Sequence, residues 1–294
     1  MSASSTRTAT RTAVRDGQGK ARSQKQLAVI GCGKMGSILL QAFLDRDLVS
    51  RKGGEVVATV QHEDKKLAAA LDGIVLGTDN RAAVSGALVV LLCVKPQVLP
   101  QVLKEIAPVI AREKDALVIS IAASTTVSFI QQQLGKDVAV IRAMPNTPAM
   151  VGAAMTALSA GATVKPEQLE TAKRLFEAVG RVVIVDEKHM DAITALSASG
   201  PAFVFVILES LAEAGVKVGL PREMATTLAA QTLFGAAKLA LETGHHPALL
   251  KDAVTTPAGC TIEGLMELER GGLRVTLMNA VITTTKRARE LMTS

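Results

Sequence analysis

Short apolar runs alternate with longer segments of helical periodicity from Leu27 to about Asp186, and this alternation constrains the fold more than any other feature. Several runs are rich in β-branched residues, as in Leu88-Val-Val-Leu-Leu-Cys-Val94, which is typical of strands covered on both faces. Strands separated by helices indicate βαβ units and a mainly parallel sheet. The expected strands are 27–30, 55–60, 88–94, 116–121, 138–142 and 181–185, with a short one near 74–76. The expected helices are 37–44, 64–71, 97–111, 126–134 and 166–179.

The strand signal ends at about Asp186, and residues 187–294 indicate an all-helical unit. Pro201, Pro221 and Pro247 each stand where a helix would begin, a position that tolerates the missing N–H. The expected helices are 190–196, 201–216, 221–243, 247–254, 261–270 and 273–292. The apolar stretch 202–208 is interrupted by Glu209 and suits a buried helix. A helical unit this small would leave much apolar surface, so we expect it to complete its core against a second subunit.

The segment Leu27-Ala-Val-Ile-Gly31-Cys-Gly33-Lys-Met-Gly36 is a strand that runs through GxGxxG into a helix. In a dinucleotide-binding turn the first glycine allows the tight turn, the second admits a pyrophosphate, and the third allows close helix–strand packing. The helix N-terminus offers free N–H groups to the phosphates. Because the motif follows the first strand of an alternating run, we expect residues 27–186 to form a Rossmann-type dinucleotide-binding domain.

The end of the second strand bears on which dinucleotide binds. An acid there would hold the ribose hydroxyls of NAD and repel the extra phosphate of NADP. The strand tip instead offers Thr59, Gln61 and His62, which are uncharged hydrogen-bonding residues. Glu63 and Asp64 follow, but they also suit the cap of the next helix. The sequence therefore favours NADPH and leaves NADH open.

The first 26 residues account for +5 of the net charge of +6, so the rest of the chain is nearly neutral. This Ser-, Thr- and Arg-rich segment is either a disordered tail or an organelle transit peptide, and the sequence does not separate the two. We expect a cytoplasmic protein, or a plastid or mitochondrial one if the segment directs import. With no Trp or Tyr and only six Phe, the chain lacks base-stacking platforms, and we expect no nucleic-acid binding.

Metal sites and membrane spans are also not expected. Cys32, Cys93 and Cys260 are far apart in the chain, and no Cys or His spacing matches a zinc site. His245 and His246, next to Pro247, suit an exposed turn better than a metal site. The longest apolar run, 87–94, is far shorter than the roughly 20 residues of a membrane-spanning helix, so we expect a soluble protein.

Hydride transfer is the chemistry that remains after several enzyme classes are set aside. Short-chain dehydrogenases need a catalytic Tyr, and the chain has none. It also lacks the GxSxG of serine hydrolases and the P-loop of NTPases. The nicotinamide carries the reaction itself, so the protein must hold a substrate beside it.

Two loops are candidates for holding that substrate. Arg142-Ala-Met-Pro-Asn-Thr-Pro148 follows the last strand of the parallel run, where ligands of such sheets bind, although it would also serve as a plain turn. Thr255-Thr-Pro-Ala-Gly-Cys-Thr261 opens a helix. This loop has two interpretations. In the first, Thr261 is only the N-cap of the helix. In the second, the free N–H groups of 258–261 bind a substrate carboxylate and the Thr261 hydroxyl reaches a ring nitrogen. The residues alone leave both loops undecided.

The chain resembles the pyrroline-5-carboxylate reductase family across about residues 27–292. The resemblance is carried by the glycine-rich turn, Val94-Lys-Pro96, Met144-Pro-Asn-Thr-Pro148, 196–203, 215–221, 251–261 and Met278-Asn-Ala280, of which 252–261 and 278–280 are the most specific. It implies a Rossmann domain, a helical dimerisation domain at 187–294, dimers that assemble further, commonly into decamers, and reduction of 1-pyrroline-5-carboxylate to proline.

The resemblance assigns most of the expected site residues by position, while Thr59 and Gln61 are expected from their place at the strand tip and Ala258 from its place in the loop. Thr256, Ala258, Gly259, Cys260 and Thr261 are expected to bind the substrate, with Thr261 as the catalytic residue that bonds the ring nitrogen. The expected cofactor-binding residues are Gly31, Cys32, Gly33, Lys34, Met35, Gly36, Thr59, Gln61, Asn80, Val94, Lys95, Pro96, Met144, Asn146 and Thr147.

Two departures from the family pattern affect these expectations. Ala258 and Ala198 stand where the family usually has glycine. If position 258 requires a positive φ, alanine is disfavoured there by roughly 1–2 kcal/mol. A β-hydroxyacid dehydrogenase, with Lys217 or Lys238 as its catalytic lysine, and a dinucleotide-sensing protein without turnover are the alternative functions.

Overall fold

The computed structural model describes residues 25–50, 55–62, 67, 71 and 73–293. The chain divides into two compact units, Met1–Met190 and Asp191–Ser294, which we describe separately. The boundary predicted from sequence lies between residues 186 and 187. The predicted tail falls outside the described residues apart from Lys25 and Gln26, which open the first strand, and most of the predicted helix 64–71 also falls outside them.

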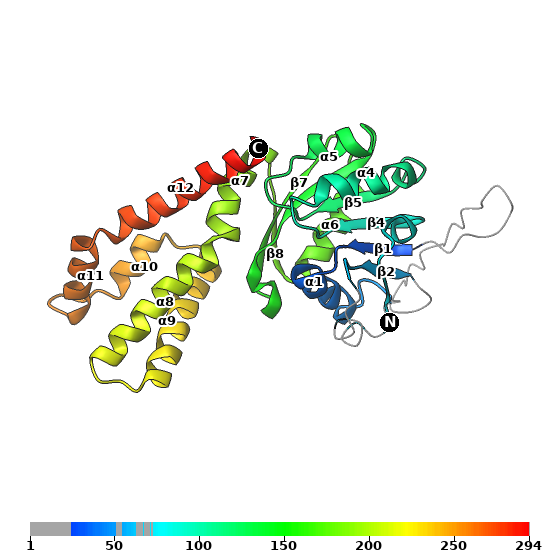
Figure 1. Cartoon of the computed structure of the whole chain (residues 1–294). Helices are drawn as coiled ribbons and strands as arrows, with labels where there is room; N and C mark the ends of the chain where they lie inside the picture. Colours follow the sequence, from blue (N-terminus) through cyan, green and yellow to red (C-terminus); the bar gives the residue numbers. More distant parts are fainter. Residues whose placement is uncertain (1–24, 51–54, 63–66, 68–70, 72, 294) are drawn as a thin grey trace, which may run out of the picture. The chain divides into compact units, whose positions relative to one another are not determined.

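The first unit is built on one eight-stranded sheet with the order β3-β2-β1-β4-β5-β6-β7-β8 (Figure 1). Strands β1 to β6 all run parallel to one another. Strand β7 runs antiparallel to β6, and β8 is parallel to β7. The bounds are β1 Lys25–Ile30, β2 Val56–Thr59, β3 Val75–Gly77, β4 Ala87–Leu92, β5 Leu117–Ser120, β6 Ala139–Met144, β7 Ala154–Ala160 and β8 Gly180–Ile184. The predicted Rossmann-type, mainly parallel α/β fold is confirmed.

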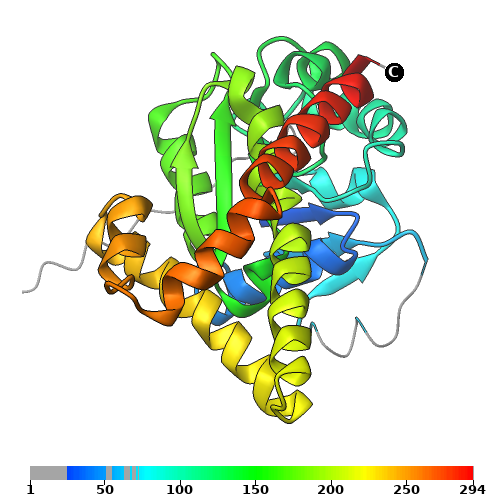
Figure 2. The same cartoon turned by 90° about the vertical axis from the view of Figure 1, so that its left-hand side faces the viewer.

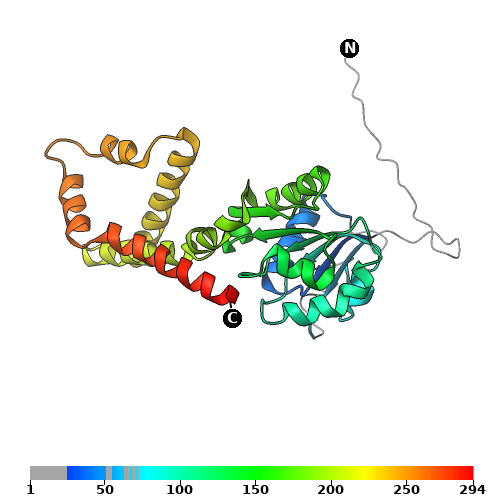
Figure 3. The same cartoon turned by 90° about the horizontal axis from the view of Figure 1, so that it is seen from above.

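Helices cover both faces of this sheet, as Figure 3 shows. One apolar core joins the sheet to α1 and α6, where the rings of Phe43 and Phe176 meet edge to face at 6.3 Å. The other core joins it to α3, α4 and α5. The helices are α1 Lys34–Asp45, α3 Asn80–Val84, α4 Leu99–Ile110, α5 Val127–Leu134, α6 Pro166–Glu177 and two 3₁₀ turns, η1 Thr147–Val151 and η2 Glu187–His189. Burial on both faces explains the continuous apolar runs of the central strands.

Apart from the two 3₁₀ turns, one strand and one α-helix of this unit were not predicted. Strand β7 reads Ala-Met-Thr-Ala-Leu-Ser-Ala, and its one β-branched residue, Thr156, gives only a weak strand signal, yet most of it is buried. Helix α3 is one short turn that begins after Asp79, whose side chain accepts from the Ala82 N–H. A helix this short shows no apolar periodicity in the sequence.

The second unit is entirely helical, as predicted. Its elements are α7 Met190–Ile193, the π-helical turn η3 Thr194–Ala198, α8 Gly200–Lys217, α9 Arg222–Thr243, α10 Pro247–Ala253, α11 Cys260–Arg270 and α12 Leu273–Thr293. Helices α8 and α9 form a hairpin (Figures 1 and 2). A side chain at Gly215 would come within 2.9 Å of the Ala225 Cβ, so glycine at this position lets α8 approach α9 closely.

Much of the apolar surface of the second unit is uncovered in the single chain, as the sequence predicts. The buried apolar residues among 191–293 are all alanines: Ala195, Ala212, Ala225, Ala229 and Ala288. Phe205 is 63% exposed and Phe234 59% exposed. The expectation that 202–208 forms a buried helix is therefore wrong for the single chain, because α9 covers only part of the surface of α8. The large side chains need a further surface to pack against.

By length and composition alone, the helical stretch Glu187–Lys217 could also cross a membrane, and 11% of its most apolar window is buried. This is weak evidence, because a helix face that packs against a second subunit has the same composition.

Candidate active site

The glycine-rich turn has the conformation that its spacing predicts. Gly31 has a φ of +77°, and a Cβ at this position would lie 2.4 Å from the Val94 Cγ1. Gly36 lies beside Cys93, whose Cβ would be 3.2 Å from an added Cβ, so helix and strand pack closely there. No atom of the described residues lies within 4 Å of a Cβ built on Gly33. The turn is therefore tightly packed at its first and third glycines. It is open at its second glycine, where a ligand could approach the protein backbone.

Helix α1 begins directly after this turn, and its N-terminus is uncapped. Gly33 is the N-cap, no side chain accepts a bond there, and the first turn carries no acid. The free N–H groups and the positive end of the helix dipole favour an anion. Of the other turn residues, Lys34 is exposed, Met35 is half-buried against the core, and Cys32 is buried. This end of α1 fits a diphosphate by charge and by space.

Thr59 and Asn80 form a hydrogen-bond network behind the turn. The Gly31 N–H donates to the Thr59 hydroxyl at 3.2 Å, and that hydroxyl donates to the Asn80 Oδ1 at 2.7 Å. Thr59 is only 2% exposed, so its hydroxyl holds the turn in place, whereas Gln61 and His62 are exposed at the strand tip. Sequence reasoning identified Thr59 but not that its side chain faces inward.

The remaining predicted cofactor residues of this unit follow β4 and β6. Val94 packs against Gly31, Lys95 is exposed, and Pro96 is half-buried. Because β1, β2, β4 and β6 run parallel through the sheet, their carboxyl ends lie at one edge. The strand order reverses at the β1–β4 pair, which is where ligands of such sheets bind. The structure thus brings the cofactor residues of this unit to one edge.

The loop after β6 is held by its own asparagine. The buried Asn146 accepts from the Met155 N–H through Oδ1 at 3.0 Å, and its carbonyl accepts from the Ala149 N–H. Met144 is also buried, while Thr147 is exposed at the start of η1. The Asn146 side chain therefore fixes the shape of the loop, and Thr147 is the residue left available to a ligand.

The two cysteines beside the turn are unreactive by environment. Burial raises the pKa of the Cys32 thiol to about 11. Burial, and then the neighbouring Cys32, raise the pKa of Cys93 further. Both thiols are therefore protonated at neutral pH and are poor nucleophiles. They contribute packing at this edge and no covalent chemistry.

The second predicted loop, in the helical unit, opens α11 without a side-chain cap. Gly259 is the N-cap, and Thr261 is the second residue of the helix, so the interpretation of Thr261 as a simple cap is wrong. Within the described part of the chain, the Thr261 hydroxyl makes no hydrogen bond. Three backbone N–H groups, those of Cys260, Thr261 and Ile262, begin the helix and suit a carboxylate.

Ala258 and Gly259 shape this loop. Ala258 has a φ of +55°, a backbone conformation that glycine adopts more readily. A Cβ on Gly259 would lie 2.4 Å from the Thr256 Oγ1, and the Gly259 N–H donates to the Thr256 carbonyl at 3.0 Å. Ala198, at the end of η3, has no positive φ. The positive φ on which the predicted strain depended is therefore present at Ala258.

The predicted loop 142–148 begins with three residues that belong to β6, and the first of them carries a buried charge that was not predicted. Arg142 is 1% exposed in β6, and its Nη1 lies 3.6 Å from the Glu187 Oε1. The same carboxylate oxygen accepts from the Val127 N–H at 2.8 Å, which ties η2 to the start of α5. An arginine inside an apolar run was the available signal, because a buried arginine requires a partner.

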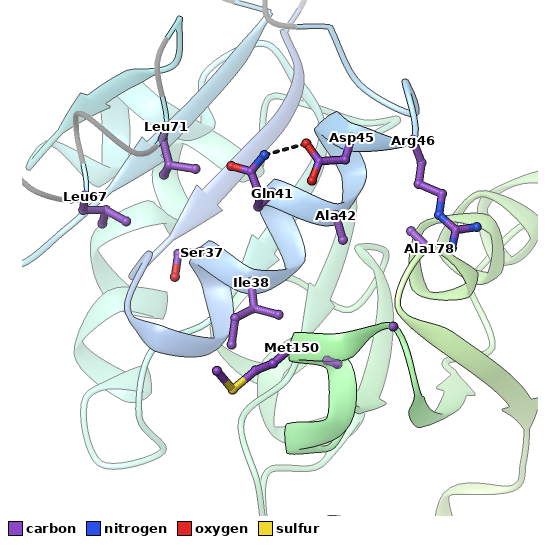
Figure 4. Close-up of a pocket in the computed structure, with 12 residues that line it drawn as sticks. Ser37, Ile38, Gln41, Ala42, Asp45, Arg46, Leu67, Leu71, Met150 and Ala178 are labelled. Carbon is purple, nitrogen blue, oxygen red and sulfur yellow. Dashed lines mark hydrogen bonds between the residues drawn. The ribbon is translucent and has the colours of Figure 1, made fainter.

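A cavity of about 480 Å³ lies beside α1 and η1, lined by Ser37, Ile38, Gln41, Met150 and further residues (Figure 4). Gln41 donates to Asp45 across its wall at 2.6 Å. None of the predicted site residues lines it, although Ser37 directly follows Gly36 of the glycine-rich turn. Among the described residues, no cluster of His, Cys, Asp and Glu could hold a metal ion.

Comparison with known proteins agrees with this geometry. The sequence model of pyrroline-5-carboxylate reductase dimerisation matches residues 187–291, and that of coenzyme F420-dependent NADP oxidoreductases matches 26–124. A pyrroline-5-carboxylate reductase of Methanosarcina acetivorans is 44% identical over 91% of this chain and 98% of its own length.

Two solved structures are similar over most of their length. The pyrroline-5-carboxylate reductase of Coxiella burnetii has a TM-score of 0.83 at 36% identity, covering 92% of this chain and 99% of that one. The Plasmodium falciparum enzyme with NADP bound has a TM-score of 0.82 at 26% identity, covering 91% and 98%. The chain is an oxidoreductase that belongs to the pyrroline-5-carboxylate reductase family.

Proposed function

We propose that this chain reduces 1-pyrroline-5-carboxylate to proline with NADPH as the hydride donor. The observation that carries the proposal is a pair of helix starts, at α1 and α11. At each of them the N-cap residue is a glycine, so no side chain of that residue occupies the first N–H groups of the helix. One suits the diphosphate of a dinucleotide, and the other suits the carboxylate of an amino-acid-like substrate. The family relatives carry the name of this activity.

The cofactor half of the proposal rests on the edge at which β1, β2, β4 and β6 end. A bound nicotinamide would supply the hydride. The α1 N-terminus would hold the diphosphate, with Gly33 leaving room for it, and Thr147 would lie toward the nicotinamide. The uncharged Gln61 and His62 favour NADPH over NADH, because neither repels a ribose phosphate. A relative solved with NADP supports the same preference.

The substrate half rests on the start of α11. The N–H groups of Cys260, Thr261 and Ile262 would bind the carboxylate, and the Thr261 hydroxyl would orient the ring nitrogen. A ring that arrives already protonated has an electrophilic C=N carbon and needs no strong general acid. The residues therefore act by positioning the two reactants, an effect that can supply most of a rate enhancement.

The assembly and location follow from the same reasoning. The alanine-lined interior of the second unit and its exposed Phe205 and Phe234 suit a homodimer, as does the match to a dimerisation domain. We propose that the dimers associate further into a decamer, as the family resemblance implies. We expect these apolar residues to meet a second subunit instead of a membrane, and we expect no nucleic-acid partner. We place the protein in the cytoplasm, or in an organelle if residues 1–26 direct import.

The two alternative functions make different predictions. A β-hydroxyacid dehydrogenase would need a catalytic lysine, but Lys217 and Lys238 are both exposed, and Lys238 lies 3.7 Å from Glu242. Membership of the reductase family also argues against this function. A sensing protein would bind the dinucleotide without turnover.

One assay separates the three functions. Purified full-length protein is mixed with NADPH and 1-pyrroline-5-carboxylate, and the absorbance of the reduced cofactor is followed. The proposal expects oxidation of NADPH with formation of proline. Cofactor binding without oxidation would indicate the sensing function, and oxidation of a hydroxyacid with NADP⁺ would indicate the dehydrogenase. Repeating the assay with NADH tests the cofactor preference.

A further inference from the structure

A glutamate in α4 ends a chain of hydrogen bonds that begins at the glycine-rich turn. The first two bonds join Gly31 to Thr59 and Thr59 to Asn80. The Asn80 Nδ2 then donates to the Glu105 Oε2 at 2.9 Å. The chain thus connects the turn after β1, the end of β2, the first residue of α3 and the middle of α4 through side chains.

Each bond in this chain has a fixed direction. The Thr59 hydroxyl accepts from the backbone N–H of Gly31, so its own proton is available to donate to the Asn80 Oδ1. A carboxylate only accepts, so Glu105 requires the NH₂ side of the Asn80 amide. Glu105 therefore determines which way round the amide lies. A reversed amide would turn its NH₂ group toward Thr59 and its oxygen toward the carboxylate.

The orientation of this amide affects the cofactor site directly. Gly31 is held at a φ of +77°, and its N–H is bound by the Thr59 hydroxyl. Asn80, at the start of α3, is half-buried, as is Glu105. A hydrogen bond to a charged acceptor is stronger than one between neutral groups, so the carboxylate is a firm end point for the chain.

The backbone of Glu105 has a separate structural role. Its carbonyl accepts from the Arg81 Nε at 2.9 Å, which joins α4 to α3 independently of the carboxylate. Replacing the side chain leaves this second link in place. The effect of the carboxylate on the site can therefore be measured apart from the packing of the two helices.

We propose that Glu105 is a positioning residue for the dinucleotide site, which orients Asn80 toward Thr59 and thereby keeps the glycine turn in the shape that receives the diphosphate. This inference rests on the proposed cofactor site. It assigns a role to a residue of α4 that the sequence motifs do not include.

The test compares Glu105→Leu with Glu105→Gln, and Lys104→Leu serves as the matched control because it places leucine at an exposed position of the same helix. Steady-state kinetics and a binding titration with NADPH are measured on each full-length protein, together with the thermal midpoint. Glu105→Leu is expected to raise the KM and Kd for NADPH about tenfold, with kcat and the KM for 1-pyrroline-5-carboxylate unchanged at saturating cofactor. Glu105→Gln retains an acceptor oxygen but loses the charge and can also donate, so its NADPH affinity is expected to fall between those of the wild type and Glu105→Leu. Lys104→Leu is expected to stay within about twofold of the wild type.

Several results would overturn the proposal. They are an unchanged NADPH affinity in folded Glu105→Leu, a Glu105→Gln variant as impaired as Glu105→Leu, or a loss confined to kcat.

A double variant of Asn80→Ala and Glu105→Leu should bind NADPH no more weakly than Asn80→Ala alone, because Glu105 acts through Asn80. Additive losses would contradict that route. A wild-type protein that neither binds NADPH nor turns over would instead refute the proposed function.

A second pair of variants covers the case in which Glu105→Leu does not fold. Asn80→Asp removes the donor to Glu105 and sets two carboxylates side by side, and adding Glu105→Gln restores a donor. The double variant is expected to bind NADPH at least about fivefold more tightly than Asn80→Asp alone. Equal affinities would contradict the proposal.

Discussion

The guanidinium of Arg142 and the carboxylate of Glu187 form an ion pair inside the first unit, with Nη1 and Oε1 3.6 Å apart and the arginine 1% exposed. Removing the acid would leave a buried charge without this partner. We expect Glu187→Ala to lower the free energy of unfolding by about 2 kcal/mol, less than for a fully buried pair, because Glu187 is partly exposed. Urea denaturation measures the change. Lys188→Ala, at an exposed neighbour, is the control, and equal stability of the two variants would argue against the pair.

Gly33 and Gly31 give a matched test of the cofactor turn. The methyl of Gly33→Ala would have no atom of the described residues within 4 Å, so the fold should keep its stability within about 0.5 kcal/mol. The Kd for NADPH should rise at least about tenfold because the methyl occupies the approach of the diphosphate. Gly31→Ala should lower both stability and binding, because it adds strain at a positive φ and a contact with Val94. Thermal unfolding and a fluorescence titration report the two effects. Tight NADPH binding by Gly33→Ala would exclude the diphosphate from this turn.

Ala258 gives a stabilising prediction. Ala258 has a φ of +55°, where the Cβ of an L-residue lies close to the following carbonyl oxygen. Because glycine has no Cβ, Ala258→Gly should raise the free energy of unfolding by about 1 kcal/mol. Ala198→Gly lies in a π-helical turn without positive φ and should instead destabilise by about 0.5–1 kcal/mol. Parallel chemical denaturation of the two variants checks the opposite signs. Loss of stability in both would mean that Ala258 is not strained.

Because Cys32 is buried, we predict that the free energy of unfolding falls at alkaline pH. Its folded pKa is raised to about 11, whereas a thiol in the unfolded chain titrates near about 8.5. Between these values the unfolded state has lost its proton and the folded state retains it, so stability falls as pH rises. The contribution of the protonated Cys32 to the free energy of unfolding is full below the pKa of the unfolded chain, and it is lost as the pH approaches 11. Cys32→Ala should weaken the slope of stability against pH between about 8.5 and 11. An identical slope would show that another group causes it.

Thr261 tests the substrate half of the site. Thr261→Ala should lower kcat/KM for 1-pyrroline-5-carboxylate by about 100-fold through misplacement of the ring, while the Kd for NADPH stays the same. Thr261→Ser keeps the hydroxyl and should retain most of the activity. The comparison requires only the reductase assay and a cofactor titration. Wild-type turnover in Thr261→Ala would remove Thr261 from the site.

The elements with a strong local pattern were predictable from the sequence. The apolar runs of β1, β4 and β5 and the GxGxxG turn predicted the sheet and the open second glycine correctly. Strand β7 was missed because its alanines and serines gain their strand structure only from pairing with β6 and β8.

Contacts between residues distant in the sequence were not predictable. Glu187 lies 45 positions from Arg142, and no local pattern joins them. Thr59 was selected by its place at the tip of the second strand and Asn80 by its likeness to a family position. Their bond to each other and the link to Glu105 depend on how β2, α3 and α4 pack. The helix start at Thr261 was predicted to within one residue. The alternative interpretation of Thr261 as the N-cap was wrong because Gly259, which has no side chain, occupies that position.

The most direct measurement of the proposed reaction site is a crystal structure of the full-length protein with NADP⁺ and proline bound. We expect the diphosphate at the start of α1, the proline carboxylate on the N–H groups at the start of α11, and the ring nitrogen at the Thr261 hydroxyl, with the ring within hydride reach of a nicotinamide. Proline bound away from α11 in every subunit of the assembly would contradict the proposed site.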